Sequence, residues 1–267
     1  MISKVIHYVW VGGNPLTPLA EKCIESWKKY CPDYEIKRWD ESNFDINENV
    51  YCKEAYENKK WAFVSDYIRL KVLYEEGGIY MDSDVEVTKP LDEFLNHKAF
   101  SGFECTMKIQ TGIIAAEKHN PWVKLMLDYY KDKHFVHEDG SLHLIPNVLF
   151  MTELTKQNYN IKLDNTYQDL GDIVFYPNDY FCPYLDEGKP LATKNTATVH
   201  HFASSWLPES YQKEKLKKHR FKSLVKKIIR FFIGKKNYEK MMQKRQKKAI
   251  QKEVDYDKIY EKIRREK

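Results

Sequence analysis

Apolar residues recur along the chain with two periods, one typical of helices and the other typical of strands. Helical spacing, interrupted by proline and glycine, predicts helices over Pro18–Tyr30, Trp61–Glu76, Asn120–Tyr130 and Asn147–Lys156. Runs of β-branched and aromatic residues predict strands over Lys4–Val11, Tyr34–Trp39, Ile79–Met81, Val85–Val87, Ala99–Glu104, Ile109–Ala116, Asp172–Tyr176 and Thr196–Phe202. Because strands and helices alternate, we expect an α/β fold with a mostly parallel central sheet and its chemistry at the strand ends.

The composition changes near residue 210. Residues 211–267 hold 22 Lys or Arg and 7 Asp or Glu, whereas the preceding residues hold 22 basic and 32 acidic ones. All prolines and tryptophans lie at or before Pro208. We therefore expect a globular domain over residues 1–210 and a basic α-helical tail over residues 211–267. Such a charge asymmetry indicates an anionic partner for the tail.

Several classes of protein are disfavoured by the composition. Charged residues are 31% and hydrophobic residues 42%, which is typical of neither a disordered chain nor a membrane bundle. No uncharged run reaches the ~20 apolar residues of a spanning helix, and the first residues lack the apolar run of a signal peptide. The five cysteines are scattered, with no C-x-x-C pair, so neither a disulfide framework nor a zinc ribbon is expected. A reducing cytoplasm is the location we expect.

Two carboxylates follow an apolar strand in the middle of the chain. If the strand continues, its alternation places Asp82 and Asp84 on the same side. They would repel each other there unless a cation or a proton lay between them, and oxygen ligands without cysteine favour Mg²⁺ or Mn²⁺. The alternative is a solvated Asp-Ser-Asp turn, but the apolar run before the pair and the β-rich run after it indicate a strand end.

A second polar pair lies on the helix that precedes this strand. Asp66 and Arg69 are three residues apart and share a helical face. They could form an intrahelical ion pair of little energetic value. They could also act on a ligand, with Asp66 accepting from sugar or ribose hydroxyls and Arg69 donating to hydroxyls or phosphate. The two residues alone leave both readings open.

Four segments resemble the D-x-D sugar-transferase family, in the order in which that family carries them. They are Ile6–Gly13, Val64–Arg69, Leu73–Asp84 and Val199–Trp206. The family includes capsular polysaccharide synthesis enzymes, yeast initiating mannosyltransferases and the glucosyltransferase domains of large glucosylating toxins. The resemblance implies a GT-A (Rossmann-like) fold, a nucleotide-sugar donor, Mn²⁺ or Mg²⁺, and transfer with retention at the anomeric carbon.

The resemblance also implies roles for individual residues. Trp10 would stack on the donor base. Asp66 and Arg69 would bind the ribose and the sugar of the donor. Asp82 would lie near the sugar hydroxyls, and Asp84 would bind the metal directly.

The last motif and a central turn add further candidates. His201 is the expected third metal ligand, with its neighbour His200 as the alternative, because adjacent strand residues point to opposite sides. Gln110 could meet the sugar or the acceptor, and Asn147 could do so or could only cap a helix. The expected donor contacts are Val9, Trp10, Asp66, Arg69, Tyr80, Asp82, Ser83, Gln110, Asn147, Ser205 and Trp206.

These expectations describe a metal-dependent, retaining hexosyltransferase of cell-surface polysaccharide synthesis. We expect a UDP-sugar donor, with GDP-mannose as the other possibility, and a glycan or lipid-linked acceptor. A phosphoryl or nucleotidyl transferase is the second class, but Gly12-Gly13 is not followed by the Lys-Ser or Lys-Thr of a phosphate loop. A non-catalytic module that binds a nucleotide-sugar or a membrane is the third.

The tail carries its own prediction. Apolar and basic residues interleave over Phe221–Gly234 as in a helix that lies on an anionic lipid surface. We expect the protein to sit peripherally at the inner face of the plasma membrane; packing of the tail on the globule is the alternative, and we expect no nucleic-acid partner. Sedimentation with vesicles tests this. The protein should bind anionic vesicles and not neutral ones, and equal binding to both, or to neither, would contradict it.

Overall fold

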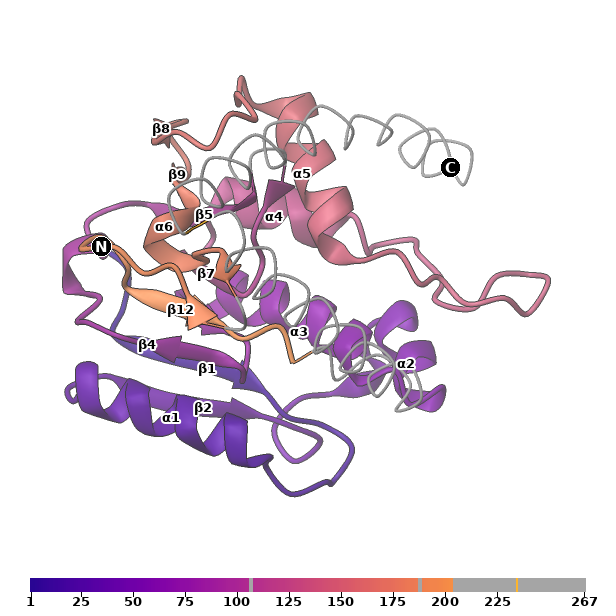
Figure 1. Ribbon diagram of the computed structural model, residues 1–267. Coiled ribbons are helices and arrows are strands. Elements are labelled where there is room, and N and C mark those ends of the chain that lie inside the picture. Colours follow the sequence, from indigo (N-terminus) through magenta and orange to yellow (C-terminus); the bar gives the residue numbers. More distant parts are fainter. Residues whose placement is uncertain (106–107, 187–188, 204–233, 235–267) are drawn as a thin grey trace. The chain divides into compact units, whose positions relative to one another are not determined.

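The computed structural model describes residues 1–105, 108–186, 189–203 and 234 (Figure 1). Met1–Ala203 form one compact unit. The predicted boundary at residue 210 and the predicted helical tail lie outside the described residues. Both therefore stay predictions.

A mixed sheet forms the centre of the unit, with strand order β2-β1-β3-β7-β5-β9-β8 and β6 paired to β5. Its strands are β1 (Val5–Val9), β2 (Glu35–Trp39), β3 (Gly78–Met81), β5 (Ala99–Cys105), β6 (Lys108–Ile109), β7 (Ile113–Ala116), β8 (Gln168–Asp169) and β9 (Val174–Tyr176). Strand β1 runs parallel to β2 and β3, β5 runs parallel to β9, and β7 lies antiparallel between β3 and β5. Five strands of this path therefore share one direction, which confirms the predicted α/β class with a mostly parallel sheet.

Both faces of the sheet are covered. The helices are α1 (Pro18–Tyr30), α2 (Val50–Glu57), α3 (Trp61–Glu76), α4 (Pro121–Asp128), α5 (Asn147–Asn158) and α6 (Asn178–Phe181). Within β3, Tyr80 enters the apolar core shared with α2 to α5, whereas Ile79 and Met81 enter the core shared with α1 and α6. This alternation of side chains is how one strand supports two layers.

A small ladder outside the central sheet bears directly on the site. Strand β4 (Val85–Val87) leaves the sheet and pairs antiparallel with β12 (Thr198–His200), as Figure 1 shows. The chain also contains a hairpin of β10 (Leu185–Asp186) and β11 (Lys189–Pro190). Two 3₁₀ turns cover Ile46–Glu48 and Asp92–Phe94.

The helices with clear capping and periodicity were predictable. Helices α1 and α3 have the predicted bounds, and Thr17 caps α1 by accepting from the amide of Ala20. Helix α2 was not predicted. Its signal was the N-cap Asn49, which accepts from the amide of Cys52. The single strand predicted over residues 109–116 is wrong, because a turn at 110–112 divides it into β6 and β7.

Other features of the unit are structural. His7 is buried, with one ring nitrogen 2.8 Å from the Gly77 carbonyl oxygen and the other 3.0 Å from the indole nitrogen of Trp39. Burial lowers the pKa of His7, so this side chain holds strands together as a neutral imidazole. Cys23, Cys31, Cys52 and Cys182 are buried free thiols. Among the described residues, no helix combines the length and the apolar character needed to cross a lipid bilayer.

The start of β3 requires a glycine at position 78, and the effect on stability can be tested. Gly78 has φ +102°, and a Cβ there would lie 2.8 Å from the backbone oxygen of Val5. Gly78→Ala should therefore cost about 2 kcal/mol or more of unfolding free energy, measured by urea denaturation. The matched control is Gly140→Ala, where φ is +79° but nothing lies within 4 Å. Equal losses in the two variants would contradict the steric argument.

Candidate active site

The candidate site lies where β3 ends and the chain turns toward β4. Asp82, Ser83 and Asp84 form this turn, closed by a 2.9 Å hydrogen bond from the amide of Val85 to the carbonyl oxygen of Asp82. The predicted strand end is confirmed. The strand does not continue through Asp84, because β4 leaves the sheet to pair with β12.

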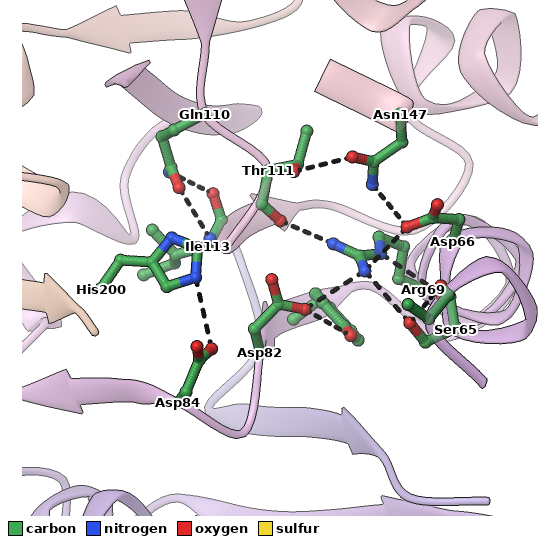
Figure 2. A network of polar contacts seen from close by, with 12 residues as sticks. Ser65, Asp66, Arg69, Asp82, Asp84, Gln110, Thr111, Ile113, Asn147 and His200 are labelled. Atoms are coloured by element: carbon green, nitrogen blue, oxygen red, sulfur yellow. Dashed lines mark hydrogen bonds and ion pairs between the residues drawn. The ribbon is translucent and has the colours of Figure 1, made fainter. Parts of the chain in front are cut away.

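Three ligand groups converge at this turn. One possible ligand atom from each of Asp82, Asp84 and His200 lies within 4.8 Å of the other two. The Nε2 of His200 lies 3.3 Å from Oδ1 of Asp84, as Figure 2 shows. The side chains of Asp84 and His200 are 16% and 15% exposed, so the cluster is recessed yet open to a small ligand.

The prediction that His201 is the metal ligand is wrong. Its Nε2 lies 2.8 Å from Oε2 of Glu86, which also receives the ammonium group of Lys22 at 2.8 Å. Adjacent residues of an extended chain point to opposite sides, which explains why His200 and not His201 meets the carboxylates. His200 therefore faces the carboxylates, and His201 ties β12 to β4.

Helix α3 adds a buried ion pair to the cluster. Arg69 Nη2 lies 2.9 Å from Oδ1 of Asp66 and 3.2 Å from Oδ1 of Asp82. Asp66 and Arg69 are both buried. The intrahelical pair therefore exists and also reaches the acidic turn, whereas binding of a ligand by Asp66 and Arg69 stays a prediction.

Each nitrogen of the Arg69 guanidinium contacts the protein. Its other contacts go to the backbone and hydroxyl oxygens of Ser65 at 3.2 Å and to the carbonyl oxygen of Thr111 at 2.8 Å. The ring of Tyr80 lies 4.6 Å from the guanidinium carbon, and the Tyr80 hydroxyl donates to Asp82 at 2.9 Å. Arg69 therefore orients Asp66 and Asp82 and offsets their charge.

Burial and neighbouring charges set the acidity of the carboxyls. Burial raises the pKa of Asp66 to about 7, with Arg69 opposing the change. Burial likewise raises the pKa of Asp82. Burial alone would raise the pKa of Asp84, but His200 and the amide of Ala203 hold it below its usual value by hydrogen bonding. Asp84 is thus kept ionised, as a metal ligand must be.

The turn between β6 and β7 supports the site from the opposite side. Gln110 is buried, and its side chain exchanges hydrogen bonds with the backbone of Ile113 at 2.6 and 3.0 Å. Its amide also donates to Ser101. The predicted donor contact by Gln110 is therefore corrected to a structural role. The same turn supplies the Gly112 carbonyl oxygen, which accepts from the amide of Asp82 at 2.8 Å.

Asn147 joins this turn to helix α3. Its amide nitrogen donates to Asp66 at 2.6 Å, and its carbonyl oxygen accepts from the hydroxyl of Thr111 at 3.0 Å (Figure 2). It is the first residue of α5, and the N-cap position is Pro146. The alternative that Asn147 only caps a helix is therefore wrong.

The remaining predicted residues surround this network. Val9 and Tyr80 are buried, and Ser83 is half-buried in the acidic turn. Trp10 is half-buried just beyond β1 and packs against the apolar core shared with α1 and α6. Ser205 and Trp206 lie outside the described residues.

Two residues of the site were missed by sequence reasoning. Ser65 accepts from Arg69, and its signal was its position four residues earlier on the same helical face. Cys182, which hydrogen-bonds His200, gave no local signal because it is 18 residues from that histidine in the sequence.

The residues present fit a divalent cation. Two carboxylates and an imidazole offer a largely oxygen donor set of the kind that Mn²⁺ and Mg²⁺ accept. Asp82, Asp84 and His200 would hold the ion.

Comparisons with known proteins agree with this geometry. Residues 18–101 match the family "Glycosyltransferase sugar-binding region containing DXD motif". An uncharacterised glycosyltransferase of Acanthamoeba polyphaga mimivirus is 26% identical over 78% of this chain and 85% of its own. The inositol phosphoceramide mannosyltransferase 3 of Schizosaccharomyces pombe is 28% identical over 46% of this chain and 35% of its own. The solved PaToxG glycosyltransferase has a TM-score of 0.44 and 22% identity, covering 58% of this chain and 69% of its own.

The matches cover unequal shares of the relatives. Among the curated proteins, the matched part ranges from 18% to 85% of the relative's own length. The region matched by the family includes α1, α3, the acidic turn and β4, and so contains Asp66, Arg69, Asp82 and Asp84. The resemblance seen in the sequence is therefore confirmed over residues 18–101, which match the sugar-binding region, with its DXD motif, of that glycosyltransferase family.

Proposed function

We propose that the protein is a metal-dependent, retaining glycosyltransferase that moves a hexose from a nucleotide-sugar to a glycan or lipid-linked acceptor. One observation carries the proposal. The cluster of Asp82, Asp84 and His200 is joined through Arg69 to Asp66, and all of these residues except His200 lie inside the matched sugar-binding region. A cation site and a hydroxyl-binding carboxylate thus lie side by side, as transfer from a diphosphate-linked sugar requires.

Different described residues bind the cation and the donor hydroxyls in this proposal. Asp84, held ionised by His200 and the Ala203 amide, binds the cation together with Asp82 and His200. A bound divalent ion supplies positive charge that offsets the charge developing on the departing diphosphate. Asp66 is placed to accept from donor hydroxyls, because Asn147 and Arg69 both contact its Oδ1.

The carboxylates of this site support a front-side route to retention. Asp82 and Asp84 belong to the cation cluster, and Asp66 is held by Arg69 and Asn147. None of these three is a free nucleophile for the anomeric carbon. A front-side reaction, in which the leaving phosphate takes the proton of the acceptor hydroxyl, needs no such nucleophile.

The donor and the cellular role complete the proposal. A UDP-sugar remains our first choice, and the mannosyltransferase among the relatives supports GDP-mannose as the other. We place the enzyme in cell-surface polysaccharide synthesis at the inner face of the plasma membrane. The basic composition of residues 211–267 supports this location, since such a segment favours anionic lipid.

Binding and transfer with a panel of donors test the function. In thermal-shift assays with UDP-, GDP- and CMP-sugars, one donor should raise the melting temperature only when Mn²⁺ or Mg²⁺ is present. Asp84→Asn and His200→Ala should each weaken Mn²⁺ binding, followed by electron paramagnetic resonance, at least about tenfold. Transfer by Asp84→Asn should fall about a hundredfold or more, because it also loses charge stabilisation in the transition state.

The chain supplies matched controls for that experiment. His201→Ala and Asp33→Asn should leave Mn²⁺ affinity within about twofold, since His201 pairs with Glu86 and Asp33 pairs with Lys4 on the surface. Binding of a donor without transfer would favour the non-catalytic binding module, and no response to any donor from folded protein would contradict the proposed function. Near-wild-type turnover of Asp84→Asn at limiting metal would refute the metal assignment.

Asp66 predicts a pH dependence of stability. Its pKa is raised to about 7 in the folded protein, against about 3.9 in an unfolded chain. Between these values the folded state binds more protons, so wild-type stability falls as the pH rises through this window. Asp66→Asn removes that loss. The difference in melting temperature, variant minus wild type, should be at least about 2 °C larger at pH 8 than at pH 5.

Asp33 serves as the control, because its pKa is shifted in the opposite direction. The hydrogen bond from Lys4 lowers the pKa of Asp33, so Asp33→Asn should show no such gain at high pH. A difference in melting temperature for Asp66→Asn that is the same at both pH values would show that Asp66 does not titrate as described.

A further inference from the structure

The loop after β1 is fastened by one carboxylate from the turn after β2. Glu41 Oε1 accepts a 2.6 Å hydrogen bond from the amide of Gly12 and a 3.0 Å hydrogen bond from the hydroxyl of Tyr56. Strands β1 and β2 are parallel neighbours, so the loops after them meet at one edge of the sheet. Glu41 thereby links the loop of residues 10–14 to helix α2.

Close packing reinforces this link. Gly12 has φ +90°, and a Cβ on it would lie 2.7 Å from Cε2 of Trp61, the first residue of α3. The rings of Tyr56 and Trp61 meet edge to face, with centroids 5.2 Å apart. We call Gly12, Glu41, Tyr56 and Trp61 the Gly12 latch.

The latch acts on the loop that carries Trp10. The amide of Trp10 donates to the carbonyl oxygen of Trp39 at 2.9 Å, which fixes its backbone at the end of β1. Its indole nitrogen donates to the carbonyl oxygen of Asn14 at 2.7 Å. The orientation of the ring therefore depends on the path of the chain from residue 11 to residue 14. That path passes through Gly12, whose lack of a side chain leaves it free to take other conformations once the latch is open.

We propose that Glu41 is a positioning residue that holds the 10–14 loop ready to receive the base of the nucleoside diphosphate. The inference rests on the proposed function and on the stacking of Trp10 on that base, which the sequence resemblance implies. With the loop fastened, nucleotide binding does not have to order it. When the contacts of the Gly12 latch are broken, only a fraction of the molecules has the loop conformation that binds the nucleotide. The apparent dissociation constant of the nucleotide then rises by the inverse of that fraction.

The role predicts a particular kinetic pattern. Glu41 lies on the loop side of the site and contacts neither the cation cluster nor Arg69 in the described structure. Opening the latch should therefore weaken the nucleotide without changing the step at the metal. KM for the donor should rise while kcat at saturating donor stays the same.

The test uses the full chain with Mn²⁺ and with UDP and GDP, measured by calorimetry. Glu41→Ala removes both hydrogen bonds to this charged acceptor and should weaken binding of the nucleotide that wild type prefers at least about tenfold. Glu41→Gln keeps an acceptor oxygen and should stay within about twofold of wild type. Glu35→Ala, which removes an exposed glutamate at the start of β2, should have no effect.

Further variants distinguish the loss of the Gly12 latch from a folding defect. Gly12→Ala should weaken the nucleotide in the same way, because its Cβ meets Trp61. Tyr56→Phe removes one of the two hydrogen bonds to Glu41 and should give a smaller loss. Unchanged affinity in folded Glu41→Ala, or an equal loss in Glu35→Ala, would overturn the inference while leaving the proposed function intact. Wild-type protein that binds neither nucleotide would overturn the proposed function, and this inference with it.

Discussion

The site depends on one buried cation, the guanidinium of Arg69. It lies within 3.2 Å of carboxylate oxygens from Asp66 and Asp82, and its remaining donors are taken by Ser65 and Thr111. Two carboxylates buried this close would otherwise repel each other, and removing one partner of a buried ion pair typically costs about 3–5 kcal/mol. Arg69 therefore fixes the distance between the helix that bears Asp66 and the turn that bears the metal motif.

The surrounding backbone is arranged to keep that turn in place. The amide of Asp82 donates to Gly112, and the amide of Ala203 donates to Asp84. Each anchor comes from a different part of the chain, one from the turn before β7 and the other from the residues after β12. The acidic turn can thus face a charged ligand without rearranging, which is the condition for electrostatic catalysis at a preorganised site.

Much of the architecture could be read from local patterns. Helices α1 and α3 have the predicted bounds, because their apolar spacing and their ends at Pro32 and Gly77 are strong signals. The compound motif from Asp66 to Asp84 also identified the centre of the site, since spacing within one helix and one strand fixes which side chains share a face. The break at 110–112 was not predictable, because it depends on hydrogen bonds between Gln110 and its surroundings.

The sequence by itself determined the α/β class, the acidic pair at a strand end and the family resemblance, because each rests on residues close together in the chain. Only the tertiary structure decided which histidine faces the carboxylates and that Asn147 reaches Asp66. It also decided that Glu41 fastens the loop bearing Trp10. These pairings join residues 29 to 116 positions apart, such as Gly12 with Glu41 and Asp84 with His200. Local periodicity carries no information at that range, and the packing of β4 against β12 and of α3 against the sheet settles them.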